Sequence, residues 1–217
     1  MKTKLDALLT TSAKFAYMGH LGAEVFGLNL ATCRINRIEA APLSQALKLQ
    51  AFGAFAVDHL DRHYLLDASR PELVGGGSIT EISERLSSRK LRGMLEENVI
   101  AEQSPILGSL GPSVSYAGLT GNRPSTALIK VGRNFAIERS QRSGKLSATF
   151  PWGATLLSYP LLDTRSVATF PPEEDVIQNQ RALGRLLGFR PTYVLIALAR
   201  VHAGYCKKVV VKLLPEP

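Results

Sequence analysis

The chain has 217 residues, of which 45% are hydrophobic and 20% charged, and it carries a formal net charge of +8. This length and composition suffice for a buried core and exclude an intrinsically disordered chain. The only two cysteines, Cys33 and Cys206, lie far apart in the sequence, which excludes a disulfide framework and predicts reduced thiols in an intracellular protein.

No membrane-spanning segment is predicted. The longest uncharged apolar run, Leu146–Leu162, is too short to span a bilayer and is interrupted by two prolines and a glycine. Near the start of the chain, Asp6 and Lys14 interrupt what would be the apolar segment of a signal peptide. The expectation is a cytoplasmic protein with no membrane partner.

The first 74 residues are predicted to be mostly helical, because apolar side chains recur there at roughly helical spacing. They are Leu5, Leu8, Leu9, Phe15, Met18, Val25 and Phe26, followed by Leu43, Leu47, Phe52, Phe55, Leu60 and Tyr64. The three glycines at 75–77 predict a hinge, since glycine restrains the backbone little. Ser78 and Glu81 have the spacing of a capping box, which predicts a linking helix over 79–99.

After this helix the sequence changes in character. Frequent prolines and glycines predict irregular structure over 104–125. Period-two alternation over 127–137 predicts a strand. The polar, basic segment 139–145 then leads into two further strand-like segments, 146–150 and 154–159, and this pattern predicts a meander with a basic tip.

The sequence pattern after residue 170 predicts one or two helices and a strand. Pro172 and the three acidic residues that follow it are typical of a helix start, and the helix is predicted to reach Leu187, with Gly188 as its C-terminal cap. Residues 192–203 have both helical and strand features, and we assign them to a helix. Residues 207–214 are predicted to form a strand.

Together these elements predict an α+β fold with a helical N-terminal half. The C-terminal half is predicted to hold a small, mainly antiparallel sheet and one or two helices. The expected organisation is a helical region over 1–74, a linking helix within 78–103 and a basic α/β region over 104–217.

All of the net charge lies in the second half of the chain. Residues 1–110 carry 12 basic and 12 acidic side chains, whereas residues 111–217 carry 14 basic and 6 acidic side chains. The stretch from Arg181 to Lys212 contains seven basic residues and no acidic one. Such an asymmetric field attracts a polyanion, and nucleic acid is the expected partner.

The residues predicted to contact nucleic acid are the basic side chains of this half and one tryptophan. Trp152 lies between a proline and a glycine, where an exposed ring could stack on a base. The full predicted set is Arg123, Lys130, Arg133, Arg139, Arg142, Lys145, Trp152, Arg181, Arg185, Arg190, Lys207, Lys208 and Lys212.

No motif in the sequence establishes catalysis. His59 and His63 have a spacing that can hold a metal, but the glutamate of the zincin motif is missing. Ser87 and Lys90 match only one of three elements of the penicillin-recognising serine enzymes. The G-x-x-G segment 118–121 is a candidate phosphate-contacting loop, although its context is not that of a KH domain. We therefore expect no metal and no cofactor, and the sequence favours a non-catalytic protein over an enzyme.

The sequence is compatible with three functions. The first is a non-catalytic, nucleic-acid-binding subunit of a ribonucleoprotein or DNA-processing assembly, which contacts other protein subunits through its N-terminal half. The second is a DNA-binding transcriptional regulator whose recognition helix would be 28–38, with Arg34, Asn36 and Arg37 as readers of the DNA. The third is an enzyme acting on a phosphorylated or acidic small substrate.

Overall fold

The computed structural model describes residues 12–39, 49–58, 69–75, 77–119, 123–178 and 180–217. The protein is mostly β, with 43% strand and 14% helix arranged as three sheets and a few short helices. The predicted α+β fold with a helical N-terminal half is therefore wrong. No helix among the described residues is long and apolar enough to cross a membrane.

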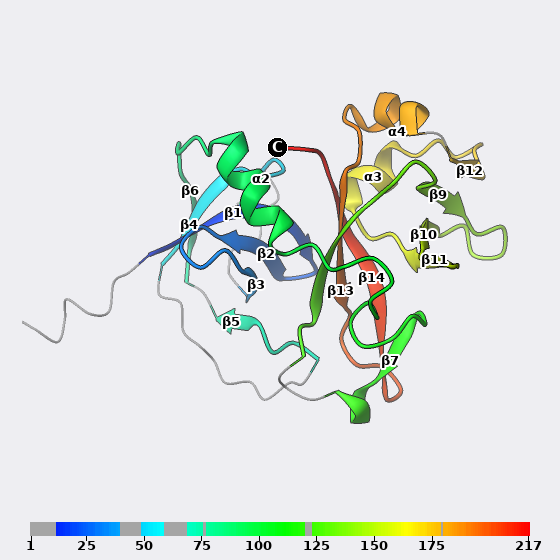
Figure 1. Ribbon diagram of the computed structural model, residues 1–217, viewed down its shortest axis with the longest axis horizontal. Coiled ribbons are helices and arrows are strands. Elements are labelled where there is room, and N and C mark those ends of the chain that lie inside the picture. Colours follow the sequence, from blue (N-terminus) through cyan, green and yellow to red (C-terminus); the bar gives the residue numbers. More distant parts are fainter. Residues whose placement is uncertain (1–11, 40–48, 59–68, 76, 120–122, 179) are drawn as a thin grey trace, which may run out of the picture. The chain divides into compact units, whose positions relative to one another are not determined.

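The chain divides into two compact units (Figure 1). Unit 1 is formed mainly by Met1–Leu65 and Glu72–Glu97, and unit 2 by Leu66–Pro71 and Asn98–Glu216. The predicted domain boundaries at 74–78 and 103–104 stay predictions.

Among the described residues, unit 1 is built on one six-stranded sheet with the order β5-β3-β2-β1-β4-β6, together with the helix α2. The first three strands form an antiparallel meander, β1 also pairs antiparallel with β4, and β3 pairs in parallel with β5. The elements are β1 (Ala13–Leu21), β2 (Glu24–Asn29), β3 (Ile35–Glu39), β4 (Ala54–Val57), β5 (Leu73–Gly75), β6 (Ile79–Glu81) and α2 (Ser88–Glu96).

This connectivity is that of the OB fold, in which a three-stranded meander is joined by a fourth strand along β1 and a fifth strand along β3. Among the described residues β4 and β5 do not pair, so the sheet is not closed into a barrel, and β6 extends it beyond β4. A register shift between Tyr17 and Gly19 interrupts β1, and such bulges allow a strand to bend from one partner to another.

Burial on both faces explains why the first strands look helical in the sequence. Five consecutive residues of β1 and five of β2 are buried, so the polar positions that would reveal a period of two are absent. The capping-box motif at 78–81 lies at β6, which pairs with β4, and the helix begins only at Ser88. The predicted recognition helix 28–38 comprises the end of β2, a turn and most of β3.

The core of unit 1 is centred on two stacked phenylalanine rings. The ring centroids of Phe15 on β1 and Phe55 on β4 are 5.4 Å apart. Gly27 on β2 lies against this pair, and a Cβ atom at that position would come within 2.9 Å of both side chains. The absence of a side chain at Gly27 therefore permits the close approach of three strands around the rings.

Unit 2 contains two antiparallel four-stranded sheets, with the orders β11-β10-β9-β12 and β7-β14-β13-β8. Its strands are β7 (Ser113–Ser115), β8 (Thr126–Lys130), β9 (Ala136–Arg139), β10 (Leu146–Trp152), β11 (Thr155–Pro160), β12 (Val176–Ile177), β13 (Tyr193–Leu198) and β14 (Tyr205–Leu214). Its helices are the 3₁₀ turn η2 (Tyr116–Gly118), α3 (Thr164–Thr169) and α4 (Gln180–Leu187).

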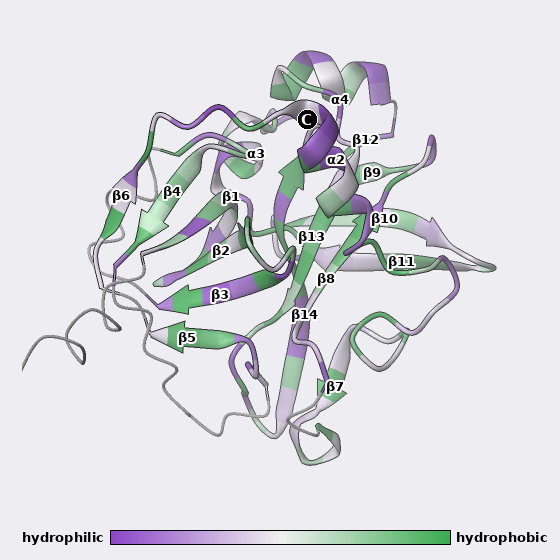
Figure 2. Cartoon of the chain, turned by 60° about the vertical axis from the view of Figure 1, so that its left-hand side comes forward, coloured by the Kyte–Doolittle hydropathy of each residue, from purple (hydrophilic) through white to green (hydrophobic). Residues whose placement is uncertain are grey.

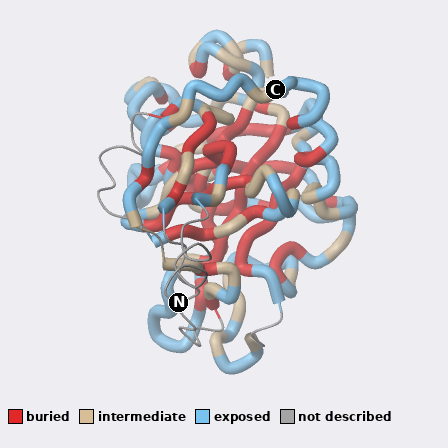
Figure 3. The backbone as a smooth tube through the Cα atoms, turned by 90° about the vertical axis from the view of Figure 1, so that its left-hand side faces the viewer, coloured by how far each residue is buried: buried red, intermediate tan, exposed pale blue. Residues whose placement is uncertain are grey.

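Both sheets of unit 2 contribute to one hydrophobic core. Ile137 on β9, Phe150 on β10, Ile196 on β13 and Val210 on β14 belong to the same buried cluster, and Leu183 on α4 joins them. Figure 2 shows β13 mostly in the green of hydrophobic residues, and Figure 3 shows buried segments of the chain surrounded by exposed ones.

Most strands predicted in this half are confirmed, but three elements differ. The strand predicted over 127–137 is two strands, β8 and β9, joined by a loop that carries Arg133. The helix predicted from Pro172 begins only at Gln180, because β12 precedes it. The helix predicted over 192–203 is wrong, since β13 occupies Tyr193–Leu198 and is buried along its full length between β8 and β14.

Candidate nucleic-acid interface

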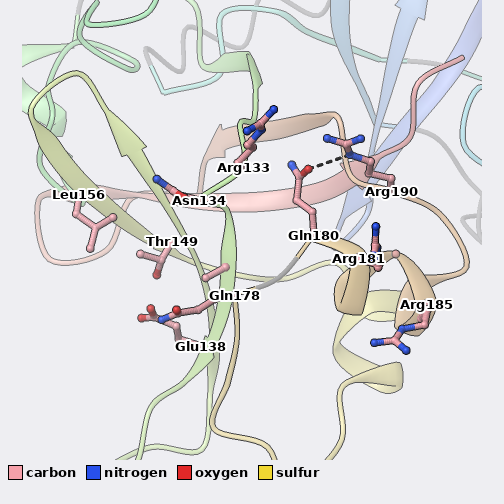
Figure 4. Close-up of a pocket in the computed structure, with 12 residues that line it drawn as sticks. Arg133, Asn134, Glu138, Thr149, Leu156, Gln178, Gln180, Arg181, Arg185 and Arg190 are labelled. Atoms are coloured by element: carbon pink, nitrogen blue, oxygen red, sulfur yellow. Dashed lines mark hydrogen bonds between the residues drawn. The ribbon is translucent and has the colours of Figure 1, made fainter.

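An open cleft of about 1120 Å³ in unit 2 brings together four of the predicted basic residues. These are Arg133, Arg181, Arg185 and Arg190, which come from three separate segments of the chain. We call this site the arginine cleft. Its other lining residues are Asn134, Ala136, Glu138, Thr149, Leu156, Gln178, Gln180 and Gly184 (Figure 4).

Helix α4 presents two of the arginines to the cleft. Arg181 and Arg185 are four residues apart and therefore share one face of the helix, while Leu183 and Leu187 are buried in the core on another face. Gly184 lies on the cleft side, and its missing side chain leaves room between the helix and the segment that carries Arg190. The amphipathic pattern of α4 thus fixes which way its arginines point.

Gln180 connects the other two arginines to this helix. Its Nε2 donates a hydrogen bond of 2.7 Å to the carbonyl oxygen of Gly132, next to Arg133 in the β8–β9 loop. Its Oε1 accepts a bond of 2.9 Å from Nε of Arg190. One amide side chain therefore holds three segments in position around the cleft, and this bond uses only Nε of the Arg190 guanidinium group.

The two walls of the arginine cleft differ in chemistry. Figure 4 shows the arginines gathered on the side of α4 and Gln180, and Glu138, Thr149, Leu156 and Gln178 on the opposite side, where β9, β10 and β11 lie. The sheet wall contains one carboxylate, one amide, one hydroxyl and an exposed leucine side chain. None of these residues was predicted from the sequence, because they are isolated polar or apolar positions within strands and loops and carry no motif.

The structure assigns other roles to four of the predicted contact residues. The guanidinium group of Arg139 donates to the carbonyl oxygens of Pro171, Gly144 and Glu174 at 2.9–3.3 Å. It also lies over the ring of Phe170, 5.1 Å from its centroid. Arg139 therefore holds two loops together.

Two lysines of β14 and the tryptophan also form contacts within unit 2. Lys212 forms an ion pair of 2.8 Å with the buried carboxylate of Asp163. Lys208 is fully buried, so it is not exposed to nucleic acid as its predicted role requires. Trp152 is also buried and its Nε1 donates to the carbonyl oxygen of Ser104 at 2.7 Å, so its predicted exposure is wrong.

Five other predicted residues are exposed but do not line the cleft. Lys130 lies at the end of β8, with its Nζ 5.9 Å from the ring centroid of Tyr193. The remaining four lie in the loop before β8, in the β9–β10 turn and on β14: Arg123, Arg142, Lys145 and Lys207. The predicted contact residues are thus divided between one cleft, contacts within unit 2 and several separate exposed positions.

The remaining candidate chemistry stays without structural support. Within the described part of the chain, no group of three His, Cys, Asp or Glu residues could hold a metal, and the predicted pair His59 and His63 lies outside that part. The G-x-x-G segment 118–121 lies partly outside it as well. Arg37, proposed as a DNA reader, is fully buried in an ion pair with Glu24.

Lys208 has an unusual environment for a lysine. Its ammonium group donates to the carbonyl oxygens of Ser109 and Gly111 and to the hydroxyl of Ser109, and it lies 5.7 Å from the ring centroid of Tyr159. Burial lowers the pKa of Lys208 to about 8, because desolvation disfavours the charged form. Burial raises the pKa of Tyr159 to about 12 for the same reason.

We expect Lys208 to make the stability of unit 2 rise with pH in the alkaline range. Below about pH 8 Lys208 is protonated in both the folded and the unfolded protein. Between about pH 8 and about 10.5 it is protonated mainly in the unfolded chain, which therefore binds more protons than the folded protein. The free energy of unfolding then increases by up to about 1.4 kcal/mol per pH unit. Above about pH 10 the ionisation of Tyr159 in the unfolded chain opposes this rise.

The measurement is denaturant unfolding followed by the fluorescence of Trp152, the single tryptophan of the chain, between about pH 7.5 and about pH 9.5. Lys208→Met should flatten the profile, whereas Lys207→Met, at an exposed neighbouring position, should retain it. Equal profiles for Lys208→Met and the parent protein would contradict the assigned pKa of Lys208.

Comparisons with known proteins give weak matches in structure alone. No family model and no curated protein matches the chain. The p204 HINb domain has a TM-score of 0.35 at 7% identity over 93% of this chain and 97% of that one. A structure described as structural mimicry for functional antagonism has a TM-score of 0.32 at 6% identity, over 93% of this chain and 90% of that one. A murine DNA binding protein bound with double-stranded DNA has a TM-score of 0.32 at 5% identity, over 94% and 98%.

Similarities this low carry no weight for fold or function.

Proposed function

We propose that this protein binds nucleic acid through the arginine cleft of unit 2. The observation that carries the proposal is the convergence of Arg133, Arg181, Arg185 and Arg190 on one open cleft, where Glu138 is the only acidic lining residue among those that the structure describes. Arginine is the side chain best suited to phosphate, because its planar guanidinium presents several donors in a fixed geometry.

The dimensions of the cleft favour a polymer over a small anion. About 1120 Å³ is slightly above the ~300–1,000 Å³ of typical small-molecule pockets, and the site is open to solvent. Its arginines are distributed over a loop, a helix and a second loop, so they can contact several phosphates at once. The OB-type connectivity of unit 1 is compatible with this function, although a fold does not by itself assign one.

We propose that the protein acts as a non-catalytic subunit in which unit 2 contacts nucleic acid and unit 1 contacts other proteins. The division of charge supports this assignment, since residues 1–110 are neutral overall and offer a polyanion no net attraction. The alternative of a DNA-binding regulator with a recognition helix at 28–38 is no longer supported, because that segment contains β3 and its Arg37 is buried.

The test is charge reversal on the cleft face of α4. Arg181→Glu with Arg185→Glu should weaken the binding of labelled RNA or DNA of any sequence by at least about tenfold at low salt. It should also reduce the slope of log affinity against log salt by about 1.4 for a single strand or about 1.8 for a duplex. The measurement is fluorescence anisotropy over a series of salt concentrations.

The matched control is Arg89→Glu with Lys90→Glu on α2, which changes the net charge equally at exposed positions outside both the cleft and the predicted contact set. This variant should lose much less affinity and keep most of the salt slope. If both double variants are folded and lose affinity equally, the effect is one of net charge and the arginine cleft is not the binding site.

A further inference from the structure

The contrast between the two walls of the arginine cleft indicates how a nucleic acid lies in it. We infer that the cleft takes a single strand, with its phosphates along the arginine wall and an unpaired base against the sheet wall, where Glu138 accepts a hydrogen bond from the base. This inference rests on the proposed function and adds the strandedness and orientation of the ligand.

Glu138 is the first reason for this orientation. Its carboxylate lines the cleft from β9, where it is half-buried, and no hydrogen bond or ion pair to it occurs among the described residues. A carboxylate repels phosphate and can only accept hydrogen bonds. The parts of a nucleic acid that complement it are the N–H groups on the edge of a base, which acidic side chains read in known complexes.

The rest of the sheet wall has the surface that a base requires. The side chain of Leu156 on β11 is apolar and 68% exposed, and it can cover the face of a base. Gln178, also on this side of the cleft, offers an amide that can donate and accept at a base edge. This wall therefore combines an apolar contact with hydrogen-bonding groups of both kinds.

Leu156 is the reason to expect an unpaired base in this arrangement. In a duplex only the edges of the bases are open in the grooves, while their faces are stacked on neighbouring bases, so the exposed Leu156 side chain could cover a base face only in a single strand. An unpaired base can turn away from its backbone, which is how proteins generally read single strands. The same reasoning requires that the affinity depend on bases as well as on phosphates.

The experiment compares three fluorescent ligands with equal numbers of phosphates: a mixed-sequence single strand, an abasic strand of the same length, and a duplex. We expect the parent protein to bind the single strand at least about tenfold more tightly than either of the others at one salt concentration. If duplex or abasic strand binds equally well, the inference is overturned, while loss of all binding in Arg181→Glu/Arg185→Glu would still support the proposed function.

Glu138→Ala should change the affinities for the base-containing strand and the abasic strand differently. Under this inference it weakens binding of the single strand about threefold or more but strengthens or preserves binding of the abasic strand, since it removes both a base contact and a repulsive charge. Leu156→Asn should likewise weaken only the base-containing strand. Glu102→Gln, at an exposed position that does not line the cleft, is the charge control. If Glu138→Ala strengthens both strands equally, Glu138 contacts no base and the inference fails.

Discussion

Replacing Arg37 with methionine should lower the free energy of unfolding of unit 1 by about 3–5 kcal/mol. In the folded protein Nε and Nη2 of Arg37 both donate to Oε2 of Glu24, the former at 2.9 Å, and the guanidinium lies over the ring of Phe26. Arg37 is 0% exposed and Glu24 2% exposed. Methionine fills a similar volume but removes both guanidinium donors from the buried Glu24 carboxylate, and the desolvation of that charge accounts for most of the loss.

Two further variants distinguish this cause from a general effect of losing an arginine. Arg34→Met, at an exposed position three residues earlier, should change stability by less than about 0.5 kcal/mol. Combining Arg37→Met with Glu24→Leu should recover much of the loss, because no unpaired charge then remains. The measurement is hydrogen exchange in β1–β3 together with denaturant unfolding. A loss in Arg37→Met no larger than in Arg34→Met would contradict the account.

Replacing Asp163 with alanine should destabilise unit 2 by about 2–4 kcal/mol. Its carboxylate is 2% exposed and accepts three hydrogen bonds, from Lys212 Nζ at 2.8 Å, Ser166 Oγ at 2.8 Å and the backbone N–H of Leu213 at 3.2 Å. Alanine leaves the buried N–H of Leu213 without this acceptor and Lys212 without its counter-charge. The expected loss is below the maximum for a buried pair because Lys212 retains some access to water.

The unfolding of this variant can be followed by the fluorescence of Trp152, which is buried in the same unit. Glu173→Ala, at an exposed position, is the control and should be nearly neutral. Lys212→Met should cost less than Asp163→Ala, because Asp163 keeps two donors, and it should leave nucleic-acid binding unchanged. If Lys212→Met weakened binding without affecting stability, Lys212 would belong to the nucleic-acid interface after all.

The sequence alone determined the electrostatic character of this protein and the elements whose pattern is local. The position of the net charge follows directly from the residue types, and the β9–β10 meander follows from alternation around a polar turn. The end of α4 was predicted correctly because Gly188, with φ of +77°, adopts the left-handed conformation that glycine tolerates.

Which basic residues a ligand can reach depends on how the chain folds. Lys208 and Arg185 look alike in the sequence, yet one is buried among carbonyl oxygens and the other lines an open cleft. The same limit applied to unit 1, where burial of β1 and β2 on both faces removed the alternation that identifies strands. In both cases the outcome depends on which side chains are covered by other segments of the chain. This burial results from contacts between residues far apart in the sequence, and a local pattern of residues does not encode such contacts.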